Sequence, residues 1–403
     1  MSGRDAQVAA QCGFRGWMAA AVGAVVLAAG CSGGGEPAGT AAGDAGLRTP
    51  RLLAELPDYC PTPDGMALDA EGNVVVACPN YGSYAEGATK PSQPAVFIRI
   101  GKDNNVAKWF ECPVMAETGR ACPMGIAFGP DGDLYVCDNQ NWPTGNGKDG
   151  ETNQGRLLRL RVKGDQVEKT TVVASGISHP NGVRVHKGQL YVTVSMLPKI
   201  ANDDGKLASA VYRFNLDDEN VAVTNTKDDK NLLVLLKTEN PDCQYGADGL
   251  VFDAQGNLYV GNFGDGALHK VTFDDKGNVT GQAVFAKTDM KTPMSDPAFK
   301  AAMVKAKMRT TDGICIDAQG RIYVADFSNN AVARVDPDGR ITVLAQNGDT
   351  DGAGGLLDQP GEPLVRGREL IVTNFDKVTG PDKVNTGHDK PYTISVIDLD
   401  GSR

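Results

Sequence analysis

The sequence predicts an all-β fold, a single six-bladed β-propeller, and three observations lead to this prediction. The chain of 403 residues contains 49 glycines and 22 prolines, a content of turn residues that favours many short strands. A strand–turn–strand unit recurs six times between residues 63 and 375. The segment before the first copy resembles the last strand of a unit, and the last copy lacks such a strand.

Each unit begins with a Gly-containing turn and an apolar strand, and a polar turn then leads to a second strand of the Leu-Tyr-Val type. The copies are PDGMALDAEGNVVVA, PMGIAFGPDGDLYVCD, PNGVRVHKGQLYVTV, ADGLVFDAQGNLYVGNF, TDGICIDAQGRIYVADF and GEPLVRGRELIVTNF. We call the residue before each first strand the marker. Successive markers are 60, 57, 67, 64 and 50 residues apart, a period typical of propeller blades.

Two weaker strands complete each unit, and the last of them predicts how the ring closes. Residues 51–56 (RLLAEL) resemble this last strand, as in TTVVAS or ITVLAQ, whereas the sixth unit stops at YTISVIDLD. We therefore expect residues 51–56 to complete blade six, because closure removes two exposed sheet edges. The predicted organisation is a leader at 1–30, a tether at 31–50 and one propeller at 51–403.

The leader has the features of a lipoprotein signal. Arg4 and Arg15 precede an apolar run at residues 18–29, which is too short to span a bilayer, and the run ends in LAAGC. This sequence resembles the bacterial lipobox, so we expect cleavage before Cys31 and acylation of that residue. The predicted location is the cell envelope, on the outer membrane facing the periplasm in a Gram-negative organism. The alternative is an ordinary cleaved signal in which Cys31 is incidental.

The composition and the motifs of the sequence narrow the classes of function that the protein can have. The formal net charge is -10, and nucleic-acid binding requires clustered Lys and Arg. The four histidines show no spacing typical of zinc ligands, and the sequence contains no G-x-S-x-G, P-loop or dinucleotide fingerprint. We expect a monomer that acts on a small molecule.

The markers predict a metal site. Since the innermost strand of each blade starts near the central channel, the markers should meet there. They are Asp64, Met124, Asn181, Asp248, Asp312 and Glu362. Carboxylates 4 Å apart repel by about 4 kcal/mol at an effective dielectric constant near 20, so either some are protonated or a cation lies among them. Oxygen ligands suit Ca²⁺ best, then Mg²⁺ and Mn²⁺. The alternative is that Asp and Asn simply form turns before Gly.

At these positions the chain resembles the SMP-30/gluconolactonase-like family of six-bladed propellers. The resemblance covers nearly all of residues 51–403 as repeat architecture and is most specific in PNGVRV and TDGICID. Family members bind a divalent cation through a Glu in blade one, an Asn in blade three, an Asn in blade four and an Asp in blade five. The resemblance implies that Asp64, Asn181, Asp248 and Asp312 take these places.

Two of these positions depart from the family. Asp64 is shorter than Glu, and Asp248 is charged where the family has an amide. Glu362, in a Gly-Glu-Pro setting similar to the family's Glu motif, is a further candidate ligand. Rotating the register by one blade would make Glu362 the family's Glu but would leave Met124 in the place of an Asn.

The resemblance implies a lactone or ester hydrolase in which the cation polarises the substrate carbonyl and activates a water molecule. Asp312 is the candidate general base or nucleophile, and His179 is a candidate proton shuttle or a solvent-exposed turn residue. Trp142 could stack on a sugar ring or pack over a blade edge. The alternatives are a non-catalytic binding propeller and a lyase or epimerase at the same centre.

Two further expectations concern local structure. Residues 295–309 should form a helix capped by Ser295 or Asp296, acting as a lid or as a packing element. Cys60 and Cys122 hold equivalent places before a first strand, and Cys78 and Cys137 hold equivalent places after a second strand. Short bridges within these two blades are therefore plausible. Cys315 is expected to be a buried free thiol.

Overall fold

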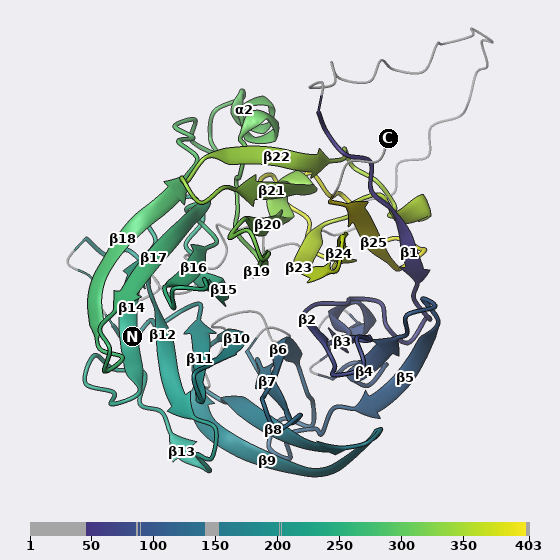
Figure 1. Ribbon diagram of the computed structural model, residues 1–403. Helices are drawn as coiled ribbons and strands as arrows, with labels where there is room; N and C mark the ends of the chain where they lie inside the picture. The colour runs from purple at the N-terminus through teal and green to yellow at the C-terminus, as the bar shows by residue number, and fades with distance from the viewer. Residues whose placement is uncertain are drawn as a thin grey trace, which may run out of the picture.

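The computed structural model describes residues 46–85, 88, 90–141, 153–200, 202 and 204–399. Their strands form six sheets arranged around a central axis (Figure 1). The first three blades contain β2 (Met66–Leu68), β3 (Val74–Cys78), β4 (Val96–Ile100), β5 (Val106–Glu111), β6 (Pro123–Phe128), β7 (Leu134–Asp138), β8 (Gly155–Lys163), β9 (Gln166–Ile177), β10 (Pro180–His186), β11 (Gln189–Val194), β12 (Ala208–Asn215) and β14 (Leu232–Lys237). The short strand β13 (Val221–Ala222) pairs in parallel with β9.

The other three blades follow the same antiparallel order from the channel outward. They contain β15 (Ala247–Phe252), β16 (Leu258–Asn262), β17 (Ala267–Phe273), β18 (Val279–Lys287), β19 (Ile314–Ile316), β20 (Ile322–Asp326), β21 (Ala331–Val335), β22 (Ile341–Gln346), β23 (Pro360–Arg366), β24 (Glu369–Asn374), β25 (Thr393–Asp398) and β1 (Arg51–Glu55). The all-β six-bladed propeller predicted from the sequence is confirmed.

Ring closure also follows the prediction. Strand β1 pairs antiparallel with β25, with Leu52 opposite Ser395 and Glu55 opposite Thr393. The first strand of the chain therefore completes the last blade, and no blade is left with three strands. Pairing the two ends of the propeller in one sheet covers both edges that would otherwise be open.

The polar turn between the first two strands has a recurring physical basis. In blade four, the Asp253 carboxylate accepts the backbone N–H of Asn257 at 2.8 Å, and Gly256 adopts φ +85°. Only Gly takes this conformation without steric cost, and the Asp side chain satisfies backbone donors that the turn leaves unpaired. The Asp-x-x-Gly spacing thus fixes the reversal that aligns the two strands.

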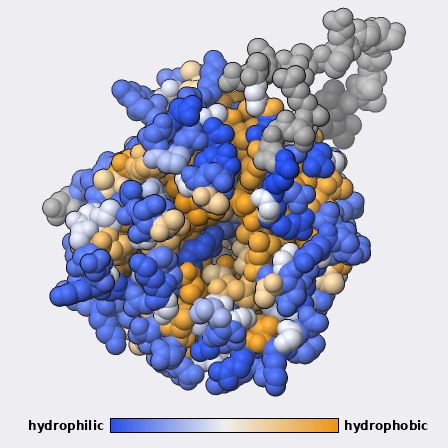
Figure 2. All heavy atoms as spheres, in the orientation of Figure 1, coloured by the Kyte–Doolittle hydropathy of each residue, from blue (hydrophilic) through white to orange (hydrophobic). Residues whose placement is uncertain are grey.

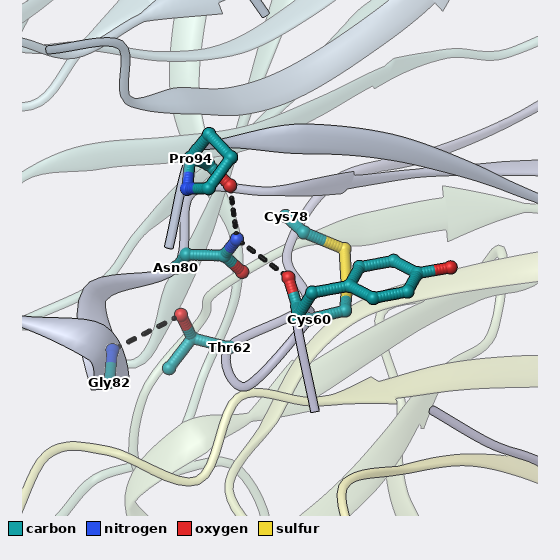
Figure 3. The surroundings of a disulfide bond; sticks show 7 residues. Cys60, Thr62, Cys78, Asn80, Gly82 and Pro94 are labelled. Carbon is teal, nitrogen blue, oxygen red and sulfur yellow. Dashed lines mark hydrogen bonds between the residues drawn. A yellow bond between two sulfur atoms is a disulfide. The ribbon is translucent and has the colours of Figure 1, made fainter. Parts of the chain in front are cut away.

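The end of the second strand is tied to the loop that enters the same blade. Asp138 accepts the N–H of Cys122 at 2.7 Å, and Asp326 accepts the N–H of Thr310 at 2.9 Å. In blade one, Cys78 holds this place and forms a disulfide with Cys60 (Figure 3). In blade one, the disulfide thus takes the place of the hydrogen bond that Asp138 accepts in blade two and Asp326 accepts in blade five.

The cysteine prediction was therefore right for blade one and wrong for blade two. Cys122 and Cys137 are buried free thiols. The residue equivalent to Cys78 is Asp138, one position after Cys137, and successive side chains of a strand point to opposite faces. Cys315 is a buried free thiol, as expected.

The predicted helix is present but shorter than expected. It is α2 (Phe299–Lys305), and its N-cap is Ala298, without a side-chain hydrogen bond. The Asp296 carboxylate instead accepts the N–H of Ala298 at 2.8 Å in the preceding turn. Phe299 and Met303 are buried against Val384, which belongs to the loop between β24 and β25. Among the described residues, no helix has the length and apolar character needed to cross a membrane.

Candidate functional site

The markers lie where neighbouring blades approach closest. The backbone carbonyls of the markers of blades two to five face the Gly that follows the marker of the preceding blade: a Cβ on Gly249 would lie 2.7 Å from the Asp312 oxygen. A Cβ on Gly182 would lie 2.8 Å from the Asp248 oxygen. Both distances are shorter than the normal van der Waals contact between a Cβ and an oxygen atom. The Gly of the marker–Gly pair is thus required by blade packing as well as by the turn.

Blade six breaks this order, which corrects the sequence alignment of its marker. Gly313 of blade five faces the carbonyl of Gly361, not that of Glu362. The backbone N–H of Glu362 donates to Thr373 at 2.8 Å, as that of Gly182 donates to Thr193 at 2.7 Å. Glu362 therefore occupies the Gly position, and the marker of blade six is Gly361. Aligning Glu362 with the Asp markers was wrong by one residue.

Three marker carboxylates share one buried region. Burial raises the pKa of Asp64 to about 8, with a further contribution from the charge of Glu362. Burial and the charge of Asp64 raise the pKa of Asp248 well above its usual range. Burial and the charges of Asp248 and Asp64 do the same for Asp312. The charges of neighbouring acids therefore add to the effect of burial at all three carboxyl groups.

The exposure of these side chains differs in a way that matters for chemistry. Asp64, Asn181 and Asp248 are 8%, 5% and 3% exposed, whereas Asp312 is partly exposed. A hydrogen bond between the two carboxyl groups adds to the rise in the pKa of Asp312 and reduces the rise in the pKa of Asp248. Asp312 is thus the carboxyl of this group best placed to exchange a proton with a molecule in the channel.

Asn181 is fixed by its neighbours. Its Nδ2 donates to the Ser195 hydroxyl and to the Tyr245 hydroxyl, both at 3.3 Å. Met124, the apolar marker of blade two, has its sulfur 3.3 Å from the Tyr81 hydroxyl, which donates to it. Because the amide nitrogen of Asn181 has hydroxyl partners, its oxygen is the atom available to a cation.

An arginine crosses the channel between opposite blades. Arg184 of β10 donates from Nη2 to Glu362 of β23 at 2.6 Å and to the Ile314 carbonyl at 3.1 Å. The Arg184 side chain is 22% exposed and that of Glu362 is 9% exposed. Burial raises the pKa of Glu362, while Arg184 opposes that rise. One Glu362 oxygen is therefore occupied by an internal cation.

Sequence reasoning missed Arg184, although a signal was present. Strand pairing makes it equivalent to apolar residues in the other blades: Ala67, Ala127, Val251, Cys315 and Leu364. A single charged residue at an otherwise apolar position of a repeat indicates a specific partner, because an unpaired buried charge is costly.

A continuous belt of aromatic rings lies beside the markers. We call Tyr245, Phe263, Phe327, Phe375 and Tyr81 the aromatic belt; successive ring centroids are 5.4, 5.8, 5.7 and 6.1 Å apart. Its members are 3–4% exposed. The Asn-Phe and Asp-Phe pairs that end three of the second strands were the sequence signal for the belt. Figure 2 shows one face of the molecule hollowed at its centre, with hydrophilic residues inside the hollow and hydrophobic residues beside it.

Three predicted site residues remain: His179, Trp142 and Cys31. His179 is fully buried, its Nδ1 lies 3.0 Å from the Ser178 hydroxyl, and burial lowers its pKa to about 3. The expectation of an exposed turn histidine is therefore wrong, and the ring is neutral at physiological pH. Trp142 and Cys31 lie outside the described residues.

The donor set has the chemistry of a hard-cation site. Three carboxylates and a carboxamide supply oxygen ligands of the kind that Ca²⁺ takes. Within the part of the chain that the structure describes, no group of three or more His, Cys, Asp or Glu side chains is drawn together as a metal-holding cluster. The residues fit such an ion by type, and the raised pKa values indicate that their charges lack compensation.

Comparisons with solved structures support the architecture. A calcium-binding protein, regucalcin, from Agrobacterium tumefaciens is 16% identical, with a TM-score of 0.52, and the match covers 87% of this chain and 95% of that chain. A luciferin-regenerating enzyme is 13% identical, with a TM-score of 0.52 over 87% of this chain and 95% of that chain. Aldose sugar dehydrogenase from Streptomyces coelicolor, in its PQQ-bound form, is 14% identical, with a TM-score of 0.50 over 87% and 97%. Identities this low show a shared fold alone.

The six closed sheets and the polar marker ring define a six-bladed β-propeller with an acidic central channel. No curated protein matches the sequence. The model of a family described as a domain of unknown function, DUF7133, matches residues 102–354, more than half of the chain. The chain belongs to the DUF7133 family. Its resemblance to SMP-30/gluconolactonase-like propellers is confirmed at the level of the fold.

Proposed function

We propose that this protein is a lipid-anchored enzyme of the bacterial envelope that binds a divalent cation in its channel and hydrolyses a small lactone or ester. The observation that carries the proposal is that burial and the charges of neighbouring acids raise the pKa values of Asp64, Asp248 and Asp312. A cation would relieve this repulsion and allow the carboxylates to close around it. Ca²⁺ is the first candidate because the ligands are oxygens.

The residues of the chain have distinct proposed roles. A bound cation would supply Lewis-acid polarisation of the substrate carbonyl and a lower pKa for a bound water. Asp64, Asn181 and Asp248 would hold that ion. Asp312, the least buried of the four, would also accept a proton from the attacking water. His179 is a weaker candidate for proton transfer, because burial keeps its ring neutral.

Glu362 has a different proposed role from that of a metal ligand. Arg184 holds Glu362 Oε1 at 2.6 Å from its Nη2, so the pair is already neutral before any ion binds. We propose that this pair bounds the cation site. The aromatic belt bounds it on another side and limits the access of water. The calcium-binding description of the regucalcin structure, at a TM-score of 0.52, supports the choice of ion.

Calorimetric titration of the chelator-treated protein with Ca²⁺ tests the cation site. We expect one ion per chain and a loss of affinity of more than about 100-fold in Asp248→Ala, because removing a ligand should exceed the roughly 10–100-fold effect of outer-sphere partners. The matched control is Asp275→Ala, the same chemical change at an exposed turn. Equal affinities in the two variants would contradict the assignment.

Hydrolysis of an aldonolactone, followed by proton release, tests the reaction. We expect chelator-sensitive activity that falls by about 100-fold or more in Asp312→Asn, within the range of general-base catalysis. If Ca²⁺ binds and no lactone or ester is hydrolysed, the alternative of a non-catalytic binding propeller is supported. The nearly complete burial of the aromatic belt favours that alternative, since it leaves little space for a substrate beside Asn181.

Two parts of the proposal concern residues outside the described structure. We expect metabolic labelling with a fatty acid to mark the wild-type protein and not Cys31→Ser. We expect Trp142→Ala to raise KM with little change in kcat if the indole stacks on the substrate. A soluble, unlabelled wild-type protein would remove the lipid anchor from the proposal and leave the channel chemistry in place.

A further inference from the structure

A second cavity, outside the central channel, carries a concentration of positive charge. It has a volume of about 530 Å³ and lies between the end of β18, residues 288–292, the C-terminal end of α2 and the turn that precedes β22. We call it the basic pocket. Its charged lining residues are Lys287, Lys291, Lys305, Lys307, Arg340 and one acid, Asp289. Such a cluster is unexpected on a chain of net charge -10.

Part of this charge lacks compensation. Lys291 pairs with Asp289 at 3.3 Å, but both side chains are highly exposed, so the pair is weak. Lys287 lies 3.7 Å from Asp265, and Arg340 lies 2.6 Å from Asp336.

The two lysines at the C-terminal end of α2, one inside the helix and one just after it, have no such acidic neighbours. Lys305 and Lys307 form no ion pair with any other residue that the structure describes. The positive potential of the pocket should therefore be greatest on the α2 side.

The carbonyl groups at the C-terminus of α2 would ordinarily repel an anion. Here they are occupied. Asn329 Nδ2 donates to the carbonyls of Met303 at 2.9 Å and Ala306 at 3.2 Å, and Gln346 Nε2 donates to that of Val304 at 3.1 Å. In addition, the Thr288 hydroxyl in the pocket wall is buried without a hydrogen-bond partner. The pocket thus combines cations, masked carbonyls and a free hydroxyl donor.

We propose that the basic pocket binds a phosphate-bearing ligand with at least two negative charges. Lys ammonium groups bind phosphate as point charges, and several of them around one cavity match a multiply charged oxyanion better than a single carboxylate. Two sources offer this chemistry: a soluble phosphate compound and the headgroup of an anionic phospholipid.

The position of the pocket makes the phospholipid source physically reasonable. The backbone N–H of Arg48 donates to the carbonyl of Leu344 in β22 at 2.8 Å, and Ile341, at the start of the same strand, lines the pocket. The chain that follows the predicted acylation site at Cys31 therefore enters the propeller along the strand that borders the basic pocket. A basic surface together with acyl chains gives more stable membrane attachment than acyl chains alone.

The test uses the full chain, without divalent cations, and two probes. Inorganic pyrophosphate is titrated by calorimetry, and vesicles of phosphatidylcholine with and without phosphatidylglycerol are compared by co-sedimentation. The variant is Lys305→Ala/Lys307→Ala, and the control is Lys227→Ala/Lys230→Ala, which removes the same charge from an exposed loop of blade three. Thermal unfolding checks that both variants are folded.

We expect binding of at least one probe, weakened about 30-fold in the pocket variant and unchanged in the control. Weakened pyrophosphate binding identifies a soluble phosphate compound, and a weakened preference for phosphatidylglycerol vesicles identifies a lipid headgroup. The proposal is overturned if neither probe binds, or if the two variants lose binding equally. Asp248→Ala should bind as wild type, so this result is independent of the central site.

Discussion

Blades five and six carry the same two kinds of residue at the channel in opposite order. Blade five has Asp312 followed by Gly313, and blade six has Gly361 followed by Glu362. In blade five the carboxylate joins the shared acidic region, where the charges of Asp248 and Asp64 raise its pKa. In blade six the carboxylate lies one residue further along and is paired with Arg184. A one-residue change in strand frame thus separates an acid that faces other acids from one that is neutralised by a guanidinium.

The comparison teaches that position within the strand matters more than residue type. Both acids lie at the channel, yet Asp312 faces other acids and Glu362 faces a guanidinium. Gly313 makes this difference possible, because its hydrogen atom leaves the space into which the Glu362 side chain extends.

The largest expected loss of stability comes from filling the space beside Gly313. In Gly313→Ala, the new Cβ would overlap Glu362 Oε2 and lie 2.7 Å from the Gly361 carbonyl oxygen. The backbone of blade six would have to move, so we expect a loss of about 3 kcal/mol in the free energy of unfolding, as in overpacked cores. Urea denaturation measures it.

The matched control for this variant is Gly348→Ala, where no atom lies within 4 Å of the new Cβ. It should change stability by no more than about 0.5 kcal/mol. Equal stability of the two Ala variants would show that blades five and six do not approach each other as described.

The next largest loss of stability is expected on removing Arg184 of blade three, the cation that pairs with Glu362 of blade six. Arg184→Met leaves Glu362 buried without its partner, and we expect a loss of about 2 kcal/mol, less than for a fully buried pair because Arg184 is 22% exposed. The double variant Arg184→Met/Glu362→Gln should recover most of this loss, since it removes both charges. Additive losses in a double-mutant cycle would argue against a direct interaction.

The smallest expected change in stability concerns Asp358, a second acid of blade six, which has no cation as a partner among the described residues. Burial and four nearby aspartates raise the pKa of Asp358 to about 8. The folded protein holds this proton more tightly than the unfolded chain, whose value is near 3.8, so this stabilising contribution is complete below pH 4 and is lost as the pH rises towards 8. In chelator, Asp358→Asn should flatten the decline in stability over this pH range. A slope identical to that of the wild type would show that Asp358 is not the source.

Much of the fold could be predicted because each blade repeats a local pattern. Three features can be recognised in the sequence: the Asp-x-x-Gly turn, the alternating apolar residues and the separate strand at residues 51–56. Together they determine the number of blades and the closure of the ring. The placement of Asp64, Asn181, Asp248 and Asp312 at the starts of the inner strands could be expected from blade geometry alone. The frame of Glu362 was misjudged, because matching residues by charge hid the exchange of Gly and acid.

The sequence by itself determined six strand pairs, their turns and a set of acids placed at the starts of the inner strands, since these depend on contacts between residues near one another in the chain. Only the tertiary structure decided which acids lie close enough to raise the pKa of another acid and which acid is neutralised by a cation. The Arg184–Glu362 pair joins residues 178 positions apart on opposite blades. Such contacts depend on how the whole ring closes, and electrostatic energies at short range change with shifts of a few ångströms.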